Sequence, residues 1–238
     1  MIEHALQLVN KRIQQACLTN HRPEDAVTLL AVSKTFGADD VRTALSCGQH
    51  RFGENYVQEA LDKIQALADV RTQLEWHLIG PLQSNKTRPV AEQFDWVQSV
   101  DRLKIAQRLS EQRPEHLTPL NVLLQVNTSG EDSKSGVAPA EVAALAQAVS
   151  ALPRLRLRGL MALPAPTPDE ASQLAAHRGL KALFDALVVT GLPLDTLSMG
   201  MSADLEAAIA EGATLVRVGT AIFGGRPRLA DLEASSRP

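Results

Sequence analysis

One lysine stands where an amine could act as a nucleophile. Lys34 directly follows the apolar run 29–33, which is typical of a buried strand. In proteins built from parallel strands and helices, sites form where the strands end. Apolar walls at such a position lower the pKa of a lysine, and a neutral amine attacks an aldehyde to form a Schiff base. On position alone, a lysine whose amine only reaches from the strand end to water is the commoner case.

A second group of residues could bind a phosphate. Gly219 and Thr220 follow the apolar run 215–218, and α/β barrels often bind phosphate in the loops after their last two strands. Gly219 lets the backbone approach a ligand closely, while Thr220 adds a hydroxyl and an N–H group. Ser202, in the turn after the preceding strand, could supply another donor. An ordinary strand-to-helix turn with a threonine cap has the same sequence.

Arg217 lies two residues before Gly219 and therefore on the same side of its strand. If that side faces the interior of the protein, the fixed charge of Arg217 needs a partner there. A pyridine ring nitrogen is one possible partner, and a carboxylate such as Glu206 or Glu54 is another.

The elements that would position these residues alternate regularly along the chain. Short apolar runs predict strands, and segments with helical spacing of apolar residues separate them. The expected strands are 27–33, 51–53, 74–79, 94–100, 120–126, 155–161, 194–198 and 215–218, and the expected helices are 39–47, 56–67, 85–93, 102–113, 140–152, 169–190 and 203–211. Strands joined by helices pair in parallel through right-handed crossovers. The pattern alone leaves open a closed barrel or an open doubly wound sheet.

An amphipathic helix over about 1–20 precedes the first strand, and it does not have the features of a signal peptide. No break in composition divides the chain, so one domain over 1–238 is expected. Hydrophobic residues make up 45% and aromatic residues 3% of the chain, which predicts a core of Leu, Val, Ala and Ile.

Composition argues against several functions. The net charge is −3 with scattered Lys and Arg, which does not indicate nucleic-acid binding, and no apolar run is long enough to span a membrane. The six histidines and two cysteines show no metal-ligand spacing, so no metal site is expected. Cys17 and Cys47 favour a reducing, cytoplasmic location, although a disulfide between them stays open. His77 is expected to be a hydrogen-bonded histidine rather than a catalytic base.

Several blocks of sequence resemble the pyridoxal phosphate homeostasis protein family. The matching blocks are 31–34, 52–56, 77–86, 198–202 and 217–224, and they follow one another in order across nearly the whole chain. The family fold is similar to the N-terminal barrel domain of alanine racemase. The resemblance therefore implies a single closed (β/α)₈ barrel of the fold-type III class, with pyridoxal 5′-phosphate (PLP) as the cofactor.

The resemblance also implies a role for each candidate residue. Lys34 would form the Schiff base with PLP, Asn55 would lie near the cofactor ring, and Arg217 would face the pyridine nitrogen. The phosphate would be held by Ser202, Gly219 and Thr220. Whether the stretch 84–86 touches PLP stays open, as does the idea that Lys86 accepts the aldehyde during release.

Two functional hypotheses belong to different classes. The first is a PLP-binding protein of intracellular PLP homeostasis that delivers the cofactor to apoenzymes without efficient catalysis. The second is a fold-type III amino-acid racemase of low activity. Related racemases use a second base, a tyrosine from a separate domain of the partner subunit, whereas Tyr56 is the only tyrosine here. We expect the chain to end after the barrel, to be monomeric and to contain no catalytic residues.

A second observation favours the carrier. Arg217 keeps its proton and disfavours protonation of the pyridine ring, which weakens the ring as an electron sink. A third hypothesis, a barrel that has lost its ligand, predicts no spectral change when PLP is added.

Overall fold

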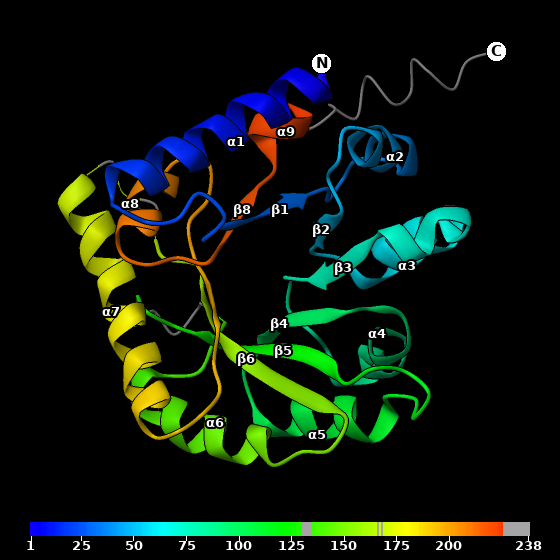
Figure 1. Cartoon of the computed structure of the whole chain (residues 1–238). Coiled ribbons are helices and arrows are strands. Elements are labelled where there is room, and N and C mark those ends of the chain that lie inside the picture. Colours follow the sequence, from blue (N-terminus) through cyan, green and yellow to red (C-terminus); the bar gives the residue numbers. More distant parts are fainter. Residues whose placement is uncertain (130–134, 166, 168, 226–238) are drawn as a thin grey trace.

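Eight parallel strands close into a barrel in the computed structural model, in the order β1-β2-β3-β4-β5-β6-β7-β8 (Figure 1). The structure describes residues 1–129, 135–165, 167 and 169–225. The strands are β1 (Thr28–Val32), β2 (Arg51–Glu54), β3 (Glu75–Leu78), β4 (Trp96–Val100), β5 (Leu120–Val126), β6 (Leu155–Ala162), β7 (Thr196–Ser198) and β8 (Leu215–Val218). The barrel closes where β1 pairs with β8, from Thr28 opposite Leu215 to Ala31 opposite Val218. This confirms the (β/α)₈ fold and excludes the open sheet.

Helices surround the barrel on its outside (Figure 1). The α-helices are α1 (Ile2–Thr19), α2 (Ala38–Ser46), α3 (Val57–Ala66), α4 (Thr87–Gln93), α5 (Leu103–Gln112), α6 (Val142–Ser150), α7 (Glu170–Val189), α8 (Leu205–Ala210) and α9 (Thr220–Phe223), and the 3₁₀ helices are η1 (Ala68–Gln73), η2 (Ser84–Lys86) and η3 (Pro139–Glu141). The N-terminal helix α1 packs against α2, α8 and α9. Within the described ranges, no helix is both long and apolar enough to cross a membrane.

The apolar residues of each strand are divided between two sides. On β1, Leu29 and Ala31 belong to the large cluster that packs beneath the helices, whereas Leu30 and Val32 belong to a small separate cluster. Successive side chains of a strand point to opposite faces. The small cluster therefore lies inside the barrel, and the main core lies between the strands and the helices.

Most element boundaries agree with the sequence patterns within two residues. β7 begins at Thr196 rather than at 194, because the N–H of Leu194 bonds the carbonyl of Leu192 in a turn. The helix predicted over 85–93 is divided into η2 and α4. Pro89 has no N–H with which to bond back one full helical turn, so it is tolerated only in the first turn of α4. The short helix α9 has no counterpart among the predicted elements.

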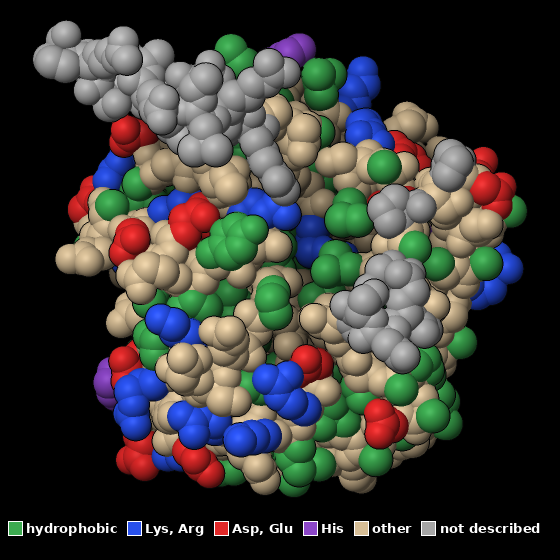
Figure 2. All heavy atoms as spheres, turned by 180° about the vertical axis from the view of Figure 1, so that it is seen from behind, with side chains coloured by type: hydrophobic (Ala, Val, Ile, Leu, Met, Phe, Trp, Pro, Cys, Tyr) green, Lys and Arg blue, Asp and Glu red, His purple; other side chains and the backbone are tan. Residues whose placement is uncertain are grey.

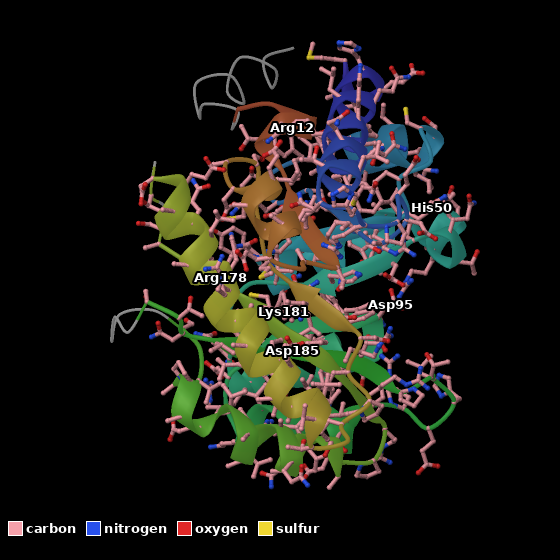
Figure 3. The ribbon with its side chains drawn as sticks, turned by 60° about the vertical axis from the view of Figure 1, so that its left-hand side comes forward. Arg12, His50, Asp95, Arg178, Lys181 and Asp185 are labelled. Atoms are coloured by element: carbon pink, nitrogen blue, oxygen red, sulfur yellow. The ribbon has the colours of Figure 1, made fainter. Side chains whose placement is uncertain are left out.

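The outer surface mixes charges of both signs. Lys181 and Asp185 on α7 form an ion pair of 2.6 Å along the helix, with Arg178 one turn away (Figure 3). On the face seen in Figure 2, basic and acidic side chains are interspersed rather than gathered into one field.

Candidate functional site

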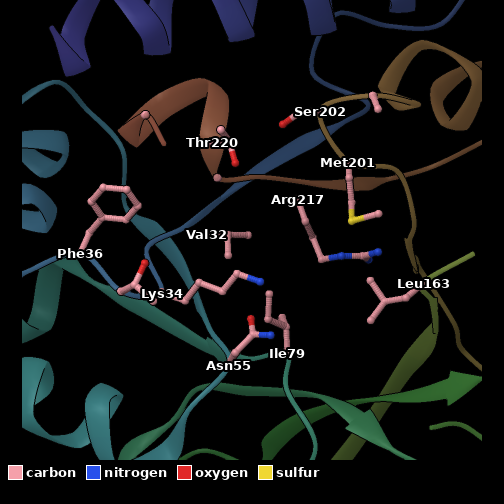
Figure 4. Close-up of a pocket in the computed structure, with 14 residues that line it drawn as sticks. Val32, Lys34, Phe36, Asn55, Ile79, Leu163, Met201, Ser202, Arg217 and Thr220 are labelled. Atoms are coloured by element: carbon pink, nitrogen blue, oxygen red, sulfur yellow. The ribbon is translucent and has the colours of Figure 1, made fainter. Parts of the chain in front are cut away.

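A pocket of about 500 Å³ opens at the mouth of the barrel where the strands end. We call this end the C-terminal mouth. The volume lies within the usual range of small-molecule sites. The loops after β1, β2, β7 and β8 contribute to its wall, and Figure 4 shows their side chains converging on one space. The lining includes every residue that the sequence analysis assigned to PLP binding, namely Lys34, Asn55, Ser202, Arg217, Gly219 and Thr220. Their binding roles remain predictions.

Lys34 follows β1 and is partly exposed at the pocket (Figure 4). No described residue forms a hydrogen bond or ion pair with its amine. The next residue, Thr35, has a φ of 68°, in the left-handed region that non-glycine residues rarely adopt. Its N–H donates to Oε1 of Glu59 over 2.6 Å, which helps to hold this turn.

A buried ion cluster lies against the turn that carries Lys34. The Nζ group of Lys63 donates to the carbonyl of Ser33, to Oε1 of Glu54 and to Oε1 of Glu59, each over 2.7 Å. Lys63 and Glu54 are both buried, and burial raises the pKa of Glu54 although the charge and the bond of Lys63 oppose this shift. The cluster fixes the backbone on both sides of Lys34. It was missed from the sequence, where its signal was a Glu and a Lys four residues apart on one helix.

Asn55 reaches the pocket from the end of β2. Its Oδ1 atom is buried and has no hydrogen-bond partner among the described residues. The backbone of Asn55 packs directly on Gly80, where an added Cβ atom would lie 2.1 Å from the carbonyl oxygen of Asn55. Only glycine fits at position 80 without displacing Asn55.

Gly219 and Thr220 join β8 to α9 and line the pocket. The sequence analysis predicts that these two residues bind a phosphate. A Cβ atom at Gly219 would lie 3.0 Å from the carbonyl oxygen of Val32, so glycine permits the close approach of this turn to β1. The first N–H groups of a helix have no partner within the helix, and those of α9 begin at Thr220. Phe223 stacks on Phe36 with ring centroids 5.2 Å apart, which anchors α9 beside the turn after Lys34.

The loop that carries Ser202 is held from two sides. Nη2 of Arg12, on α1, donates to the carbonyl of Ser202 over 3.1 Å, and the same guanidinium pairs with Glu206 over 2.9 Å. On the other side, Asp204 accepts from the N–H of Met201 over 2.7 Å. The loop is therefore tied to the N-terminal helix, a contact that spans 190 residues of sequence.

The interior partners of Arg217 differ from those expected. Glu206 pairs with Arg12 and Glu54 pairs with Lys63, so neither carboxylate neutralises Arg217. Its Nη1 donates to Oγ of Ser198 over 2.5 Å, and its Nη2 donates to the carbonyl of Ala162 over 2.7 Å. Of the two alternatives for Arg217, the carboxylates of Glu206 and Glu54 are therefore excluded, and the pyridine nitrogen stays a prediction. Charge alone does not reveal which residues share one end of the barrel.

Burial lowers the pKa of Arg217 to about 10, opposed by the nearby charge of Asp204. Arg217 is therefore protonated at neutral pH. A guanidinium has five N–H donors, so the bonds to Ser198 and Ala162 leave others for a ligand in the pocket.

Three other residues from the sequence analysis lie away from this pocket. Tyr56 is 58% exposed, and Lys86 is exposed at the end of η2. His77 is fully buried and hydrogen-bonded, as expected, between Glu75 and Gln98.

A second cavity, of about 410 Å³, lies at the opposite end, where the strands begin. We call this end the N-terminal mouth. Its charged groups are paired with one another: Arg51 with Glu75 over 3.2 Å, and Arg158 with Asp195 over 2.7 Å. The Arg158 guanidinium also lies 4.8 Å from the ring centroid of Trp96. No group of three or more potential metal ligands occurs among the residues that the structure describes.

Comparison with known proteins relates the chain to two groups. The family model of the alanine racemase N-terminal domain matches residues 11–227. A pyridoxal phosphate homeostasis protein of Pseudomonas aeruginosa is 62% identical over 92% of this chain and 93% of its own length. A protein of the same name from Escherichia coli K12 is 54% identical over 94% of this chain and 97% of its own.

Solved structures agree with these matches. The structure of PipY from Synechococcus elongatus with PLP bound has a TM-score of 0.81 at 38% identity, over 94% of this chain and 100% of that chain. An alanine racemase from Clostridium difficile has a TM-score of 0.70 at 17% identity, over 94% of this chain and 58% of that chain. At that identity the likeness concerns the fold.

Proposed function

The chain belongs to the pyridoxal phosphate homeostasis protein family, and from this we propose that it binds PLP in the pocket at the C-terminal mouth, as a Schiff base on Lys34. We propose that it serves intracellular PLP homeostasis by holding and delivering the cofactor. The names of the relatives and the PLP bound to PipY support this proposal. The match of the family model to residues 11–227 supports one PLP-binding domain.

One observation carries the proposal: the amine of Lys34, which pairs with no described residue, lines the same pocket as the Gly219–Thr220 turn. An amine for the aldehyde and a turn of N–H and hydroxyl donors for the phosphate are the two groups that PLP requires. Asn55 lines the same pocket, and its buried Oδ1, which has no partner among the described residues, suits a polar substituent of the ring. These residues fit PLP, which supplies a reactive aldehyde when bound.

Each residue then has a task that its surroundings support. The buried cluster around Lys63 holds the turn of Lys34, and Gly80 holds Asn55 at the ring. Arg217 presents N–H donors to the ring nitrogen while its charge keeps that nitrogen unprotonated. The phosphate is bound by three residues on the far side of the pocket, Ser202, Gly219 and Thr220.

The composition of the pocket supports a carrier rather than a racemase. Among the described residues that line it, Lys34 and Arg217 alone have ionisable side chains. A racemase needs two groups that exchange a proton on opposite faces of the ring, and an arginine that stays protonated is a poor base. The unprotonated ring beside Arg217 also stabilises a carbanion weakly.

Absorbance spectroscopy tests the proposal. Adding PLP to the purified chain should produce the absorption band of a protein Schiff base, and Lys34→Ala should abolish it. Lys86→Ala, which removes an exposed lysine outside the pocket, is the matched control and should retain the band. Borohydride reduction followed by peptide mapping should place the label on Lys34 alone. An unchanged band in Lys34→Ala would exclude this residue as the attachment point.

Two assays distinguish carrier from enzyme. The PLP-loaded chain should show no robust racemisation of a panel of L-amino acids, and turnover that depends on Lys34 would overturn the carrier. It should transfer PLP to a PLP-dependent apoenzyme, measured as recovered activity of that enzyme. We further propose that the protein is a monomer, which sedimentation would test, and that it is cytoplasmic, which the free thiols of Cys17 and Cys47 support.

A further inference from the structure

A line of polar side chains crosses the interior of the barrel from one mouth to the other. Such interiors are normally packed with branched apolar residues. Here His77 on β3, Gln98 on β4, and Ser198 on β7 are fully buried inside it. They connect Arg217 at the C-terminal mouth with Glu75 at the N-terminal mouth, where the Glu75 side chain is 36% exposed.

Four consecutive hydrogen bonds form this line. Nη1 of Arg217 donates to Oγ of Ser198 over 2.5 Å, and that hydroxyl donates to Oε1 of Gln98 over 2.7 Å. Nε2 of Gln98 lies 2.9 Å from Nδ1 of His77, and Nε2 of His77 lies 2.8 Å from Oε1 of Glu75. Residues from four strands of the barrel therefore share one network.

The chemistry of the two ends fixes the direction of every bond. A guanidinium can only donate, so the Ser198 oxygen must accept, and the Ser198 proton goes to an oxygen of Gln98. The Gln98 amide then presents its NH₂ group to Nδ1 of His77, which must accept. The proton of His77 is consequently on Nε2, where the Glu75 carboxylate can accept it. Rotating the Gln98 amide or the His77 imidazole by 180° would break both hydrogen bonds that the rotated group forms in this network.

We propose that Ser198, Gln98, His77 and Glu75 are positioning residues for Arg217, joined in a one-directional hydrogen-bond chain that fixes how this guanidinium faces the pocket. Hydrogen bonds that point the same way in a buried interior of low dielectric constant polarise and strengthen one another. The chain also gives the buried charge of Arg217 an indirect link to a carboxylate, although no carboxylate of the described residues forms an ion pair with it. The consequence for PLP, an arginine held in one orientation at the ring nitrogen, rests on the proposed function.

The ionisation of the two titratable members agrees with this direction. Burial lowers the pKa of His77, although the bond and charge of Glu75 act to raise it, so the imidazole is neutral and can accept at Nδ1. Burial acts to raise the pKa of Glu75, but the bond from His77 and the charge of Arg51 outweigh it. The pKa of Glu75 therefore lies below its ordinary value, and this residue is an acceptor at neutral pH.

The first experiment needs no PLP. Nitrogen-15 NMR of histidine-labelled protein should show His77 as a neutral imidazole with its proton on Nε2. Ser198→Ala should shift the Nδ1 resonance of His77 although Ser198 does not touch that ring, because it frees the Gln98 amide. Ser110→Ala is the matched control, since Ser110 is equally buried but lies on α5 outside this network. A proton on Nδ1, or an Nδ1 resonance that Ser198→Ala does not shift, would contradict the proposed hydrogen-bond chain.

The second experiment follows bound PLP. Ser198→Ala and Gln98→Met should change the ratio of the absorption bands of bound PLP and speed its release by roughly two- to tenfold, the effect of one or two lost hydrogen bonds. Ser110→Ala should lower stability without changing the bands. Bands unchanged in both network variants would overturn the positioning role. Failure of the unaltered protein to bind PLP would instead refute the proposed function. The NMR result would still decide the direction of the hydrogen bonds between Arg217 and Glu75.

Discussion

The two mouths of the barrel contain similar cavities but treat their polar groups differently. At the N-terminal mouth, Arg51 and Arg158 are paired with the carboxylates of Glu75 and Asp195. At the C-terminal mouth, the Lys34 amine and the Oδ1 atom of Asn55 have no partner among the described residues. Buried polar groups are nearly always satisfied in folded proteins. The amine of Lys34 beside the buried acceptor of Asn55 therefore supports the proposal that a ligand binds at the C-terminal mouth. At the N-terminal mouth the charged groups satisfy one another, although Nε1 of Trp96 has no hydrogen-bond partner among the described residues.

The largest expected effect comes from the buried cluster behind the Lys34 turn. Lys63→Met leaves the buried carboxylate of Glu54 without its counter-charge. Breaking such a pair costs about 3–5 kcal/mol. We expect a loss of this size in the free energy of unfolding, measured by urea denaturation, together with weaker PLP binding.

An exposed pair provides the control for that comparison. Lys181→Met breaks the surface pair with Asp185 on α7, whose side chains are 36% and 54% exposed (Figure 3). Surface pairs contribute about 0–1 kcal/mol, so this variant should remain close to the unaltered protein. Equal losses in the two variants would contradict a special role for the buried cluster.

Gly80→Ala should disturb the C-terminal mouth through crowding rather than charge. The added methyl would overlap the carbonyl of Asn55, and such overpacking costs about 1–3 kcal/mol. Displacement of Asn55 should also weaken PLP binding in an absorbance titration. Gly179→Ala is the matched control: no atom lies within 4 Å of its added Cβ, and alanine favours a helix, so stability should rise by about 0.5–1 kcal/mol.

Arg12→Ala should have a smaller effect, mainly on ligand binding, because its exposed pair with Glu206 contributes only about 0–1 kcal/mol to stability. It removes the bond to the Ser202 carbonyl, and a lost hydrogen bond of about 0.5–1.5 kcal/mol corresponds to roughly two- to tenfold weaker PLP binding. Lys11→Ala, an exposed neighbour on α1, should bind PLP with unchanged affinity. An Arg12→Ala variant that binds PLP with full affinity would show that the Ser202 loop does not need its hydrogen bond to α1.

Arg158, which lies at the N-terminal mouth but outside the hydrogen-bond chain that reaches Arg217, should have the smallest influence on the pocket. Arg158→Ala breaks the pair with Asp195 and the contact with Trp96, which together suggest a stability loss of about 1 kcal/mol. The dissociation constant of PLP should not change. If Arg158→Ala weakened PLP binding as much as Arg12→Ala, the two mouths would be coupled through Arg158. The contrast between a ligand-binding mouth and a stabilising mouth would then be wrong.

Much of the fold could be predicted because apolar runs and helical spacing are local signals. The strands expected over 120–126 and 215–218 agree with β5 and β8 residue for residue. Closure of the barrel could not be predicted in this way, because hydrophobic periodicity is the same in a closed and an open sheet. The prediction of a closed barrel came from the family resemblance. Lys34 and Gly219 could be singled out because each directly follows a strand.

The supporting contacts could not be predicted in this way. The hydrogen bond between Arg12 and Ser202 joins residues 190 positions apart in the sequence. The bond between Ser198 and Gln98 joins residues 100 positions apart. Such pairs depend on how strands neighbour one another across the barrel, and a single sequence does not record that geometry. Lys63 had a local signal in its spacing from Glu59, but the same spacing is common on solvated helix faces.

The contact between α1 and the last helices has a consequence for synthesis. α1 is translated before every strand of the barrel, yet its apolar stripe packs against α8 and α9, which follow β7 and β8 in the chain, and β1 likewise pairs with the much later β8. During elongation that stripe must remain exposed or find temporary cover, because its permanent neighbours do not yet exist. Contacts so distant along the chain also slow folding. This protein should therefore acquire its native state mainly after translation, with its early segments available to chaperones until the ring closes.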